Sequence, residues 1–324
     1  MKKLRMGVVG VGYLGKFHAE KYVKMDDVFL AGVVDINKKQ AHDVAEKVCT
    51  TAYTNYKHLF GKVDAVSIAV PTPFHFAISK DFLKNNVHVL IEKPITTTLR
   101  EADELMMIAK SNKSIIQVGH LERYNPAVVA LQDIIGDPIF VESHRLCFFK
   151  NRCLDVSVVI DLMIHDIDII LNFVKSEIKD ICAAGISVIS EHVDIANARL
   201  EFTNGCIANV TASRISTKNE RKLRLFQKDA YISVDFANRN ISTIRKQSSS
   251  NQNELIPGMD IQKNCFTKGD ALEDELLSFV RAVKNKVTPE VTGQMGRDAL
   301  KIALNIMEQI NITNKSFVKK QHQI

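Results

Sequence analysis

Short apolar runs alternate with helical patterns over the first part of the chain. The runs lack regular polar alternation, as is typical of parallel strands buried on both faces of a sheet, and they lie at 5–9, 29–34, 65–70, 87–91 and 115–118. Apolar positions recur with helical spacing between these runs, at 14–24, 38–48, 74–85 and 99–111. Thr98 and Glu101 have the spacing of a capping box at the start of the last helix. This alternation predicts an α/β fold that begins with a doubly wound parallel sheet.

A different pattern begins after Gly119. In the stretch 195–202, Ala198 and Leu200 point to one face of a predicted strand while polar residues point to the other, and Asn204-Gly205 supplies a hairpin turn. The pattern also predicts strands at 139–146, 206–215, 221–226 and 231–236, helices from 126 and at 156–173, 271–284 and 296–310, and a loop over 237–268. The sequence therefore predicts a first domain at 1–121 and a second at 122–324. The second is an α+β domain with a large, mainly antiparallel open sheet, and its C-terminal helix is able to pack back on the first domain.

A glycine-rich motif joins the first strand to the first helix. It has the pattern G-x-G-x-x-G and consists of Gly10, Val11, Gly12, Tyr13, Leu14 and Gly15. In this context the first glycine allows a tight turn, the second lets backbone amides approach a pyrophosphate, and the third lets the helix pack closely on the strand. Asp35 ends the second strand, where a carboxylate accepts hydrogen bonds from ribose hydroxyls. The motif therefore predicts a Rossmann domain that binds NAD in preference to NADP, although Lys38 and Lys39 leave a 2′-phosphate possible.

Three further segments carry candidate chemistry. Val70 to His75 and Ile91 to Pro94 follow two of the parallel strands, and ligands bind at the carboxyl ends of strands in open α/β sheets. Asp161, His165 and Asp168 stand at i, i+4 and i+7, which places them on one face of a helix. No cysteine or second histidine joins that group, so we predict no metal site there.

Composition and charge limit the classes of partner. The chain has 324 residues, 46% of them hydrophobic, and a formal net charge of +6 from 43 Lys and Arg against 37 Asp and Glu. This excess suits an anionic small molecule, and without a helix-turn-helix, a zinc finger or an aromatic-basic surface we predict no nucleic-acid partner. The six cysteines form no C-x-x-C pair, and no run of about 20 apolar residues or secretory signal is present. We therefore predict a cytoplasmic protein without a membrane span.

These motifs resemble the glucose-fructose oxidoreductase / inositol dehydrogenase / rhizopine-catabolism family, whose members oxidise sugars and cyclitols with NAD(P). The resemblance covers nearly the whole chain. It rests on the glycine motif, Glu92-Lys93-Pro94, Gly119-His120, the segment 123–126 and the D-x-x-x-H-x-x-D pattern at 161–168, in which Met163 replaces a glycine that many relatives carry. It implies a Rossmann domain, a C-terminal domain on a large open sheet, and a homodimer or homotetramer formed through that sheet.

The resemblance also implies roles for individual residues. It places Lys93, Asp161 and His165 against the substrate, and it lines the cofactor with Thr72, Pro73, His75, Glu92 and Lys93. We predict further substrate contacts from Arg123, Tyr124, Asn125 and Arg152, the last because a guanidinium suits phosphate.

We expect alcohol oxidation in which His165 takes the hydroxyl proton, Asp161 orients the imidazole and Lys93 stabilises the hydroxyl oxygen. Lys93 as the proton acceptor is the alternative. The segment 145–168 resembles the branch that oxidises UDP-N-acetylglucosamine at its 3-hydroxyl, whose 3-keto product is aminated for a 3-amino lipid A. An inositol or free-sugar dehydrogenase and a non-catalytic NAD-binding sensor are the other hypotheses.

Overall fold

The chain divides into two compact units in a computed structural model. The structure describes residues 3–149, 155–246, 259–267 and 269–321, with side chains described as far as 315. The first unit contains 1–121 and 270–300, and the second contains 122–269 and 301–324. Each unit is built around its own sheet.

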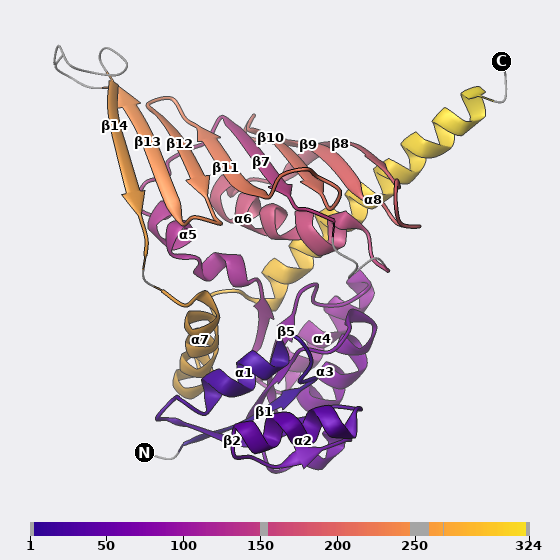
Figure 1. Cartoon of the computed structure of the whole chain (residues 1–324), viewed down its shortest axis with the longest axis vertical. Helices are drawn as coiled ribbons and strands as arrows, with labels where there is room; N and C mark the ends of the chain where they lie inside the picture. The colour runs from indigo at the N-terminus through magenta and orange to yellow at the C-terminus, as the bar shows by residue number, and fades with distance from the viewer. Residues whose placement is uncertain (1–2, 150–154, 247–258, 268, 322–324) are drawn as a thin grey trace. The chain divides into compact units, whose positions relative to one another are not determined.

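The first unit contains a six-stranded parallel sheet with the strand order β3-β2-β1-β4-β5-β6. Figure 1 labels three of these strands, β1, β2 and β5. Its strands are β1 (Leu4–Val9), β2 (Val28–Val34), β3 (Ala52–Tyr53), β4 (Ala65–Ile68), β5 (His88–Glu92) and β6 (Ile116–Gly119). The connecting helices include α1 (Gly15–Tyr22), α2 (Lys38–Lys47), α3 (His75–Lys84) and α4 (Leu99–Ser111). This order reverses between β1 and β4, which is the place where doubly wound sheets bind dinucleotides. The predicted α/β fold is confirmed, and so is the capping box of α4.

Helix α7 (Ala271–Asn285) completes the core of this unit although it comes late in the sequence. Its apolar face buries Leu276, Phe279 and Val280 in one cluster with Met6 and Tyr22. The helix begins at Asp270, whose carboxylate accepts a hydrogen bond from the N–H of Glu273. The residues of α7 are therefore an integral part of the Rossmann unit.

The second unit contains an eight-stranded sheet with the order β14-β13-β12-β11-β7-β10-β9-β8. Its strands are β7 (Phe140–Leu146), β8 (Ile178–Ile186), β9 (Ile195–Phe202), β10 (Ile207–Ser213), β11 (Glu220–Phe226), β12 (Ala230–Asp235), β13 (Asn240–Lys246) and β14 (Met259–Cys265). Only the β7–β10 pair is parallel among these described strands. The prediction of a mainly antiparallel sheet is therefore confirmed.

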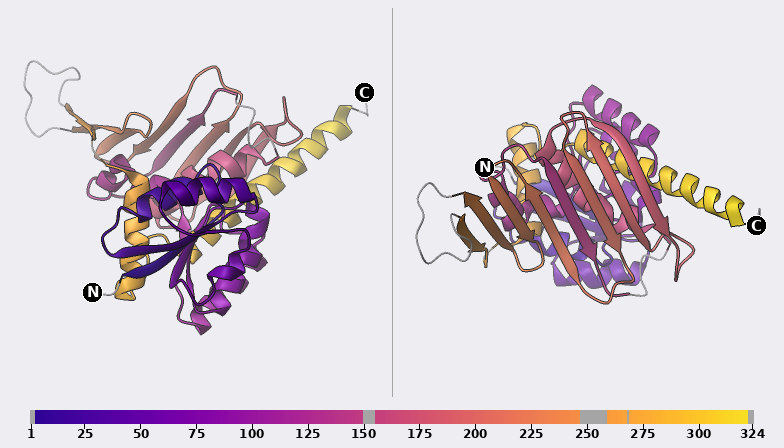
Figure 2. Two further views of the ribbon diagram at one scale, coloured as in Figure 1. Left: turned by 60° about the horizontal axis from the view of Figure 1, so that its bottom comes forward. Right: turned by 90° about the horizontal axis from the view of Figure 1, so that it is seen from above.

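One face of this sheet packs on helices. Ala198 and Leu200 of β9 are fully buried, as their alternation predicts, and α5 (Pro126–Leu131) and α6 (Ile164–Val174) cover the buried face. The opposite face is open in the right panel of Figure 2, where the strands lie side by side. Helix α8 (Gly293–Gln321) passes β8, where the Asn314 side chain donates to the carbonyl of Gly185.

The prediction of a loop over 237–268 is wrong at 240–246 and 259–265, and its residues 247–258 and 268 lie outside the described residues. The segment contributes β13 and β14, which pair in antiparallel register, so that the sheet extends two strands beyond β12. Their sequences mix polar and apolar residues without a clear strand pattern. These strands form because their backbones make hydrogen bonds with a neighbouring strand. Strands β3 and β8 were also missed, and α8 is longer than the predicted helix at 296–310.

Within the described residues, no helix is long and apolar enough to cross a membrane.

Candidate active site

The glycine motif forms a tight turn between β1 and α1. Gly10 has a φ of +83°, and a Cβ added there would lie 2.7 Å from the carbonyl oxygen of Ala69. A Cβ on Gly15 would lie only 1.8 Å from the carbonyl oxygen of Gly10. Gly12, in contrast, is exposed, and no atom lies within 4 Å of the position its Cβ would occupy. The packing of the protein's own backbone therefore requires glycine at positions 10 and 15. At Gly12 no such contact exists, and the space above the backbone is open. Tyr13 and Leu14 complete the motif, Tyr13 being largely exposed and Leu14 preceding α1.

Asp35 lies directly after β2, beside this turn. Its Oδ2 accepts a hydrogen bond of 3.1 Å from the N–H of Val11, and its Oδ1 accepts one of 2.9 Å from the N–H of Asn37. The side chain of Gln40 donates to the carbonyl of Val11 at 2.7 Å. These bonds hold a half-buried carboxylate at the edge of the glycine turn, as a ribose-binding residue requires.

The segments after β4 and β5 are joined through His75. Its Nδ1 lies 2.9 Å from the carbonyl oxygen of Pro94, and its Nε2 lies 2.8 Å from that of Val70. Burial lowers the pKa of this imidazole. Thr72 and Pro73 lie in the short 3₁₀ helix before His75. The buried His75 thus fixes the position of the backbone that carries Glu92 and the half-buried Lys93.

The first unit fits NAD at this edge of the sheet. The open space over Gly12 faces no protein atom, the N-terminus of α1 follows the turn, and the Asp35 carboxylate is held beside it. Gly10, Gly12 and Gly15 would accommodate the pyrophosphate, and Asp35 would bind the adenosine ribose.

Asp161 and His165 lie at a change of helix type in the second unit. Asp161 belongs to a π-helical turn, Val159–Met163, and His165 is the second residue of α6. Both side chains are half-buried, whereas Asp168 is fully buried. A π-helical turn inside a helix is frequent at functional sites, because it changes the direction in which side chains project.

Two buried arginines in this unit are held by carboxylates. The Arg123 guanidinium donates to Asp168, with Nη2 2.9 Å from Oδ1, and Arg145 donates to Asp166, with Nε 2.7 Å from Oδ2. Glu122 also accepts from Arg145 at 3.2 Å. The acidic neighbours raise the pKa of Arg145 against the effect of burial. The pattern at 161–168 therefore contains two acidic residues, Asp166 and Asp168, that stabilise buried cations.

The other predicted substrate residues have different positions. Asn125 is buried, its side chain accepts from the N–H of Ala127 at the start of α5, and it donates to the carbonyl of Phe236. Tyr124 is buried beside it. Arg152 lies outside the described residues. Substrate contacts by Arg123, Tyr124, Asn125 and Arg152 stay predictions.

Removing one partner of the buried Arg123–Asp168 pair is expected to destabilise the protein strongly. Asp168→Asn should lower the free energy of unfolding by about 3 kcal/mol, because it leaves the Arg123 charge buried without its counterion. Asp43→Asn is the control, since Asp43 pairs with Lys39 at the exposed surface and its removal should not change stability measurably. Urea unfolding of both variants measures the difference, and equal effects would contradict it.

Two protein-family models match this chain. Residues 4–120 match the family model of oxidoreductases with an NAD-binding Rossmann fold, and residues 132–233 match the GFO/IDH/MocA C-terminal domain. UDP-N-acetylglucosamine 3-dehydrogenase from Acidithiobacillus ferrooxidans is 36% identical over 99% of this chain and 100% of its own length. Myo-inositol 2-dehydrogenase from Thermotoga maritima is 24% identical over 92% of this chain and 93% of its own.

Solved structures show the same fold. A structure of the A. ferrooxidans UDP-N-acetylglucosamine 3-dehydrogenase matches with a TM-score of 0.90 at 36% identity, over 96% of this chain and 98% of that one. Levoglucosan dehydrogenase in complex with NADH and levoglucosan matches with a TM-score of 0.85 over 96% and 98% of the two chains, and at 17% identity it shows the fold alone.

The Rossmann unit with its glycine turn, followed by the large open sheet, defines an NAD-dependent oxidoreductase. The chain belongs to the GFO/IDH/MocA oxidoreductase family, whose sugar and cyclitol dehydrogenases are its relatives. The predicted family, enzyme class and cofactor are confirmed.

Proposed function

We propose that this enzyme oxidises the 3-hydroxyl of UDP-N-acetylglucosamine to the 3-keto sugar with NAD. The observation that carries the proposal is the end-to-end similarity to a relative of that name, at 36% identity over 99% of the chain. The inositol dehydrogenases match at lower identity or over a smaller share of the chain. A nucleotide sugar also suits the net positive charge of +6.

The proposed mechanism assigns three roles to side chains of this chain. Lys93 binds the hydroxyl oxygen and stabilises the negative charge that develops on it. His165 takes the hydroxyl proton, because imidazole titrates near neutrality, and Asp161 orients the ring and stabilises the imidazolium. Lys93 in the role of proton acceptor is the alternative. Bound NAD supplies the hydride acceptor.

NADH formation tests the substrate. UDP-N-acetylglucosamine, free N-acetylglucosamine, levoglucosan and myo-inositol are each supplied with NAD and with NADP, and absorbance of the reduced nicotinamide is recorded. We expect turnover with the nucleotide sugar and NAD. Turnover of a free sugar or of myo-inositol without turnover of UDP-N-acetylglucosamine would refute the proposed substrate and identify the compound that is turned over as the substrate.

Asp35 is expected to set the cofactor preference. Asp35→Ser should lower the ratio of kcat/KM for NAD to that for NADP at least about tenfold, because it removes a carboxylate that repels a 2′-phosphate. Asp26→Ser removes an exposed carboxylate of the same unit and serves as the control. An unchanged ratio in the Asp35 variant would show that cofactor choice is made elsewhere.

We also infer that the enzyme works in the cytoplasm as a homodimer or homotetramer formed through its large sheet. A row of half-buried apolar side chains crosses five neighbouring strands of that sheet in register and consists of Phe140, Phe226, Tyr231, Ile244 and Ile261. Such a row suits the centre of an interface with a second copy. Sedimentation equilibrium should give the mass of two or four chains for the wild type and of one chain for Phe226→Glu, whereas a monomeric wild type would refute the proposal.

A further inference from the structure

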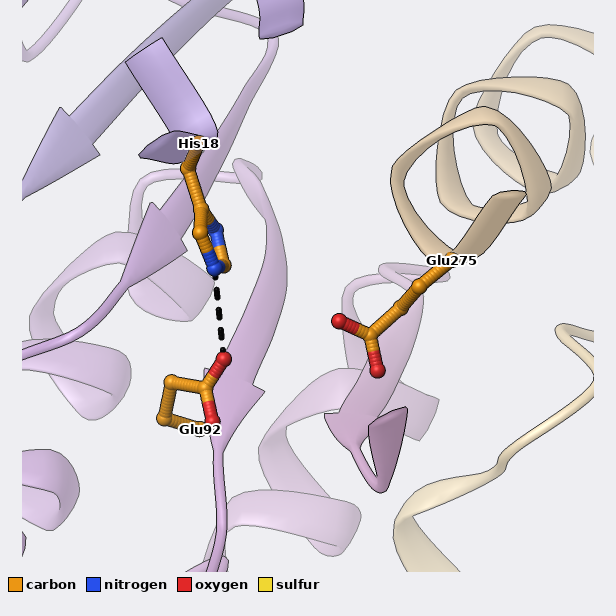
Figure 3. A group of neighbouring side chains, drawn as sticks. All are labelled: His18, Glu92 and Glu275. Carbon is orange, nitrogen blue, oxygen red and sulfur yellow. Dashed lines mark ion pairs between the residues drawn. The ribbon is translucent and has the colours of Figure 1, made fainter. Parts of the chain in front are cut away.

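Three ionisable side chains meet in the interior of the first unit. His18 comes from α1, Glu92 from the end of β5 and Glu275 from α7, as Figure 3 shows. His18 and Glu275 have no exposed surface. One nitrogen or oxygen atom from each of the three side chains lies within 4.8 Å of the other two. Lys93 is the next residue after Glu92, so the cluster adjoins the backbone of Lys93.

The Glu92 carboxylate is fixed from several sides. Its Oε1 lies 3.3 Å from Nε2 of His18, and its Oε2 accepts a hydrogen bond of 3.3 Å from the backbone N–H of Lys93. The carboxylate lies against β6, where a Cβ on Gly119 would come within 2.9 Å of its atoms. The position of Glu92 is therefore coupled to the backbone of Lys93.

Glu275 faces this pair without a counterion. Neither of its carboxyl oxygens has a hydrogen-bond partner among the described residues, and Figure 3 shows the group directed toward Glu92. An ionised carboxylate in that position would be desolvated and would lie beside a second carboxylate, so burial and the charge of Glu92 raise its pKa well above the usual value. The backbone carbonyl of Glu275 accepts from the side chain of the buried Gln117 at 3.0 Å, which holds this turn of α7 in place.

We propose that Glu275 is a positioning residue, whose carboxyl group stays neutral, donates a hydrogen bond into the His18–Glu92 pair and thereby fixes the Glu92–Lys93 backbone. The cluster then holds one carboxylate charge instead of two. The Glu275 carboxyl group lies within 4.8 Å of the pair, and a side-chain movement that closes this gap forms a charge-assisted bond to Glu92, which is stronger than a neutral one.

The same three side chains are also of the types that bind a divalent cation. A metal with three protein ligands completes its coordination with water or substrate, whereas the His18 and Glu92 side chains are 0% and 12% exposed and Glu275 is fully buried. The burial therefore favours a shared proton, and metal binding is an outcome that the experiment must detect.

Infrared spectroscopy of the whole chain at neutral pH tests the protonation state directly. We expect the carbonyl stretch of a protonated carboxylic acid in the wild type and its loss in Glu275→Gln. Glu273→Gln is the control, because Glu273 lies on the same helix and pairs with Lys21 near the surface, and it should keep the band. Absence of the band in the wild type, its persistence in Glu275→Gln, or one tightly bound metal ion per chain that Glu275→Gln removes would each overturn the proposal.

The pH dependence of stability gives a second measurement. The titratable groups that face Glu275 are His18 and Tyr22 from α1 and Glu92 from β5. Glu275→Gln replaces the titratable carboxyl group with a neutral amide of nearly the same shape. A raised pKa means that folding retains a proton that unfolding releases. The wild type should therefore lose stability relative to Glu275→Gln as pH rises above about 4.3, by up to tenfold in the unfolding equilibrium constant per pH unit. Parallel curves for the two proteins would overturn the proposal.

The kinetic consequence rests on the proposed function. Glu275→Leu should lower kcat about tenfold or more with little change in KM for NAD, and Glu275→Gln should restore kcat to within about threefold of the wild type, because its amide still donates a hydrogen bond. Equal loss in both variants would overturn the positioning role. If no variant and no wild-type protein turns over the nucleotide sugar, the substrate assignment fails while the infrared result still decides the state of Glu275.

Discussion

Lys93→Ala and His165→Ala should each lower kcat at least about 100-fold while the protein still binds NAD. General acid–base catalysis and stabilisation of a developing oxyanion contribute factors of this size. Lys93 is half-buried after β5, and His165 is half-buried at the start of α6 behind a π-helical turn. Stopped assays of NADH formation measure kcat, and quenching of protein fluorescence or calorimetry measures NAD binding.

Matched controls remove a similar side chain from the surface. Lys84→Ala and His192→Ala change exposed residues of the two units and should keep kcat within about twofold.

The pH profile of kcat/KM then identifies the proton acceptor. Removing the acceptor abolishes the limb of the profile in which that group must be deprotonated. Near-normal turnover by both Lys93→Ala and His165→Ala would refute the catalytic assignment.

Alanine substitutions at two glycines of the same motif should have different effects on stability and on NAD affinity. Gly12→Ala should leave the free energy of unfolding unchanged within about 0.5 kcal/mol, because its Cβ meets no protein atom within 4 Å. It should raise the Kd for NAD at least about tenfold, because the methyl group occupies the space where the pyrophosphate approaches the backbone.

Gly15→Ala should damage both folding and binding. Its Cβ would lie 1.8 Å from the Gly10 carbonyl oxygen, and the shift of α1 needed to relieve that contact should cost about 3 kcal/mol or more of stability. Urea unfolding and NAD titration of the two variants measure the contrast. A destabilised Gly12→Ala protein, or a Gly12→Ala protein with unchanged NAD affinity, would show that the space over Gly12 is not where the cofactor lies.

Much of the fold was predictable because its signals are local. The glycine motif, the capping box of α4 and the alternation in 195–202 are all confirmed, since each depends on neighbouring residues. The strands at 240–246 and 259–265, which were predicted as loop, were missed because their signal is not local. Strand β13 forms because its backbone pairs with β12 on one side and β14 on the other, and β14 itself is mostly exposed.

Some residues of the candidate site could be predicted from the sequence and others could not, for the same reason. Asp35 and Glu92 could be identified because Asp35 follows β2 and Glu92 ends β5, and the sequence marks both strands clearly. His18 and Glu275 gave no comparable signal, since a histidine on a short helix and a glutamate in a late helix are ordinary until the fold brings them to Glu92.

The sequence by itself determined the doubly wound sheet, the glycine turn and the family, because these depend on the periodicity of apolar residues and on glycines whose spacing is local. Only the tertiary structure decided which charged groups are buried together. It showed that Arg123 is held by Asp168, 45 residues away, and that Glu275 lies without a counterion beside His18 and Glu92. The physical reason is that desolvation and pairing depend on distances in space, and residues far apart in the chain come within hydrogen-bonding range only when the core has formed.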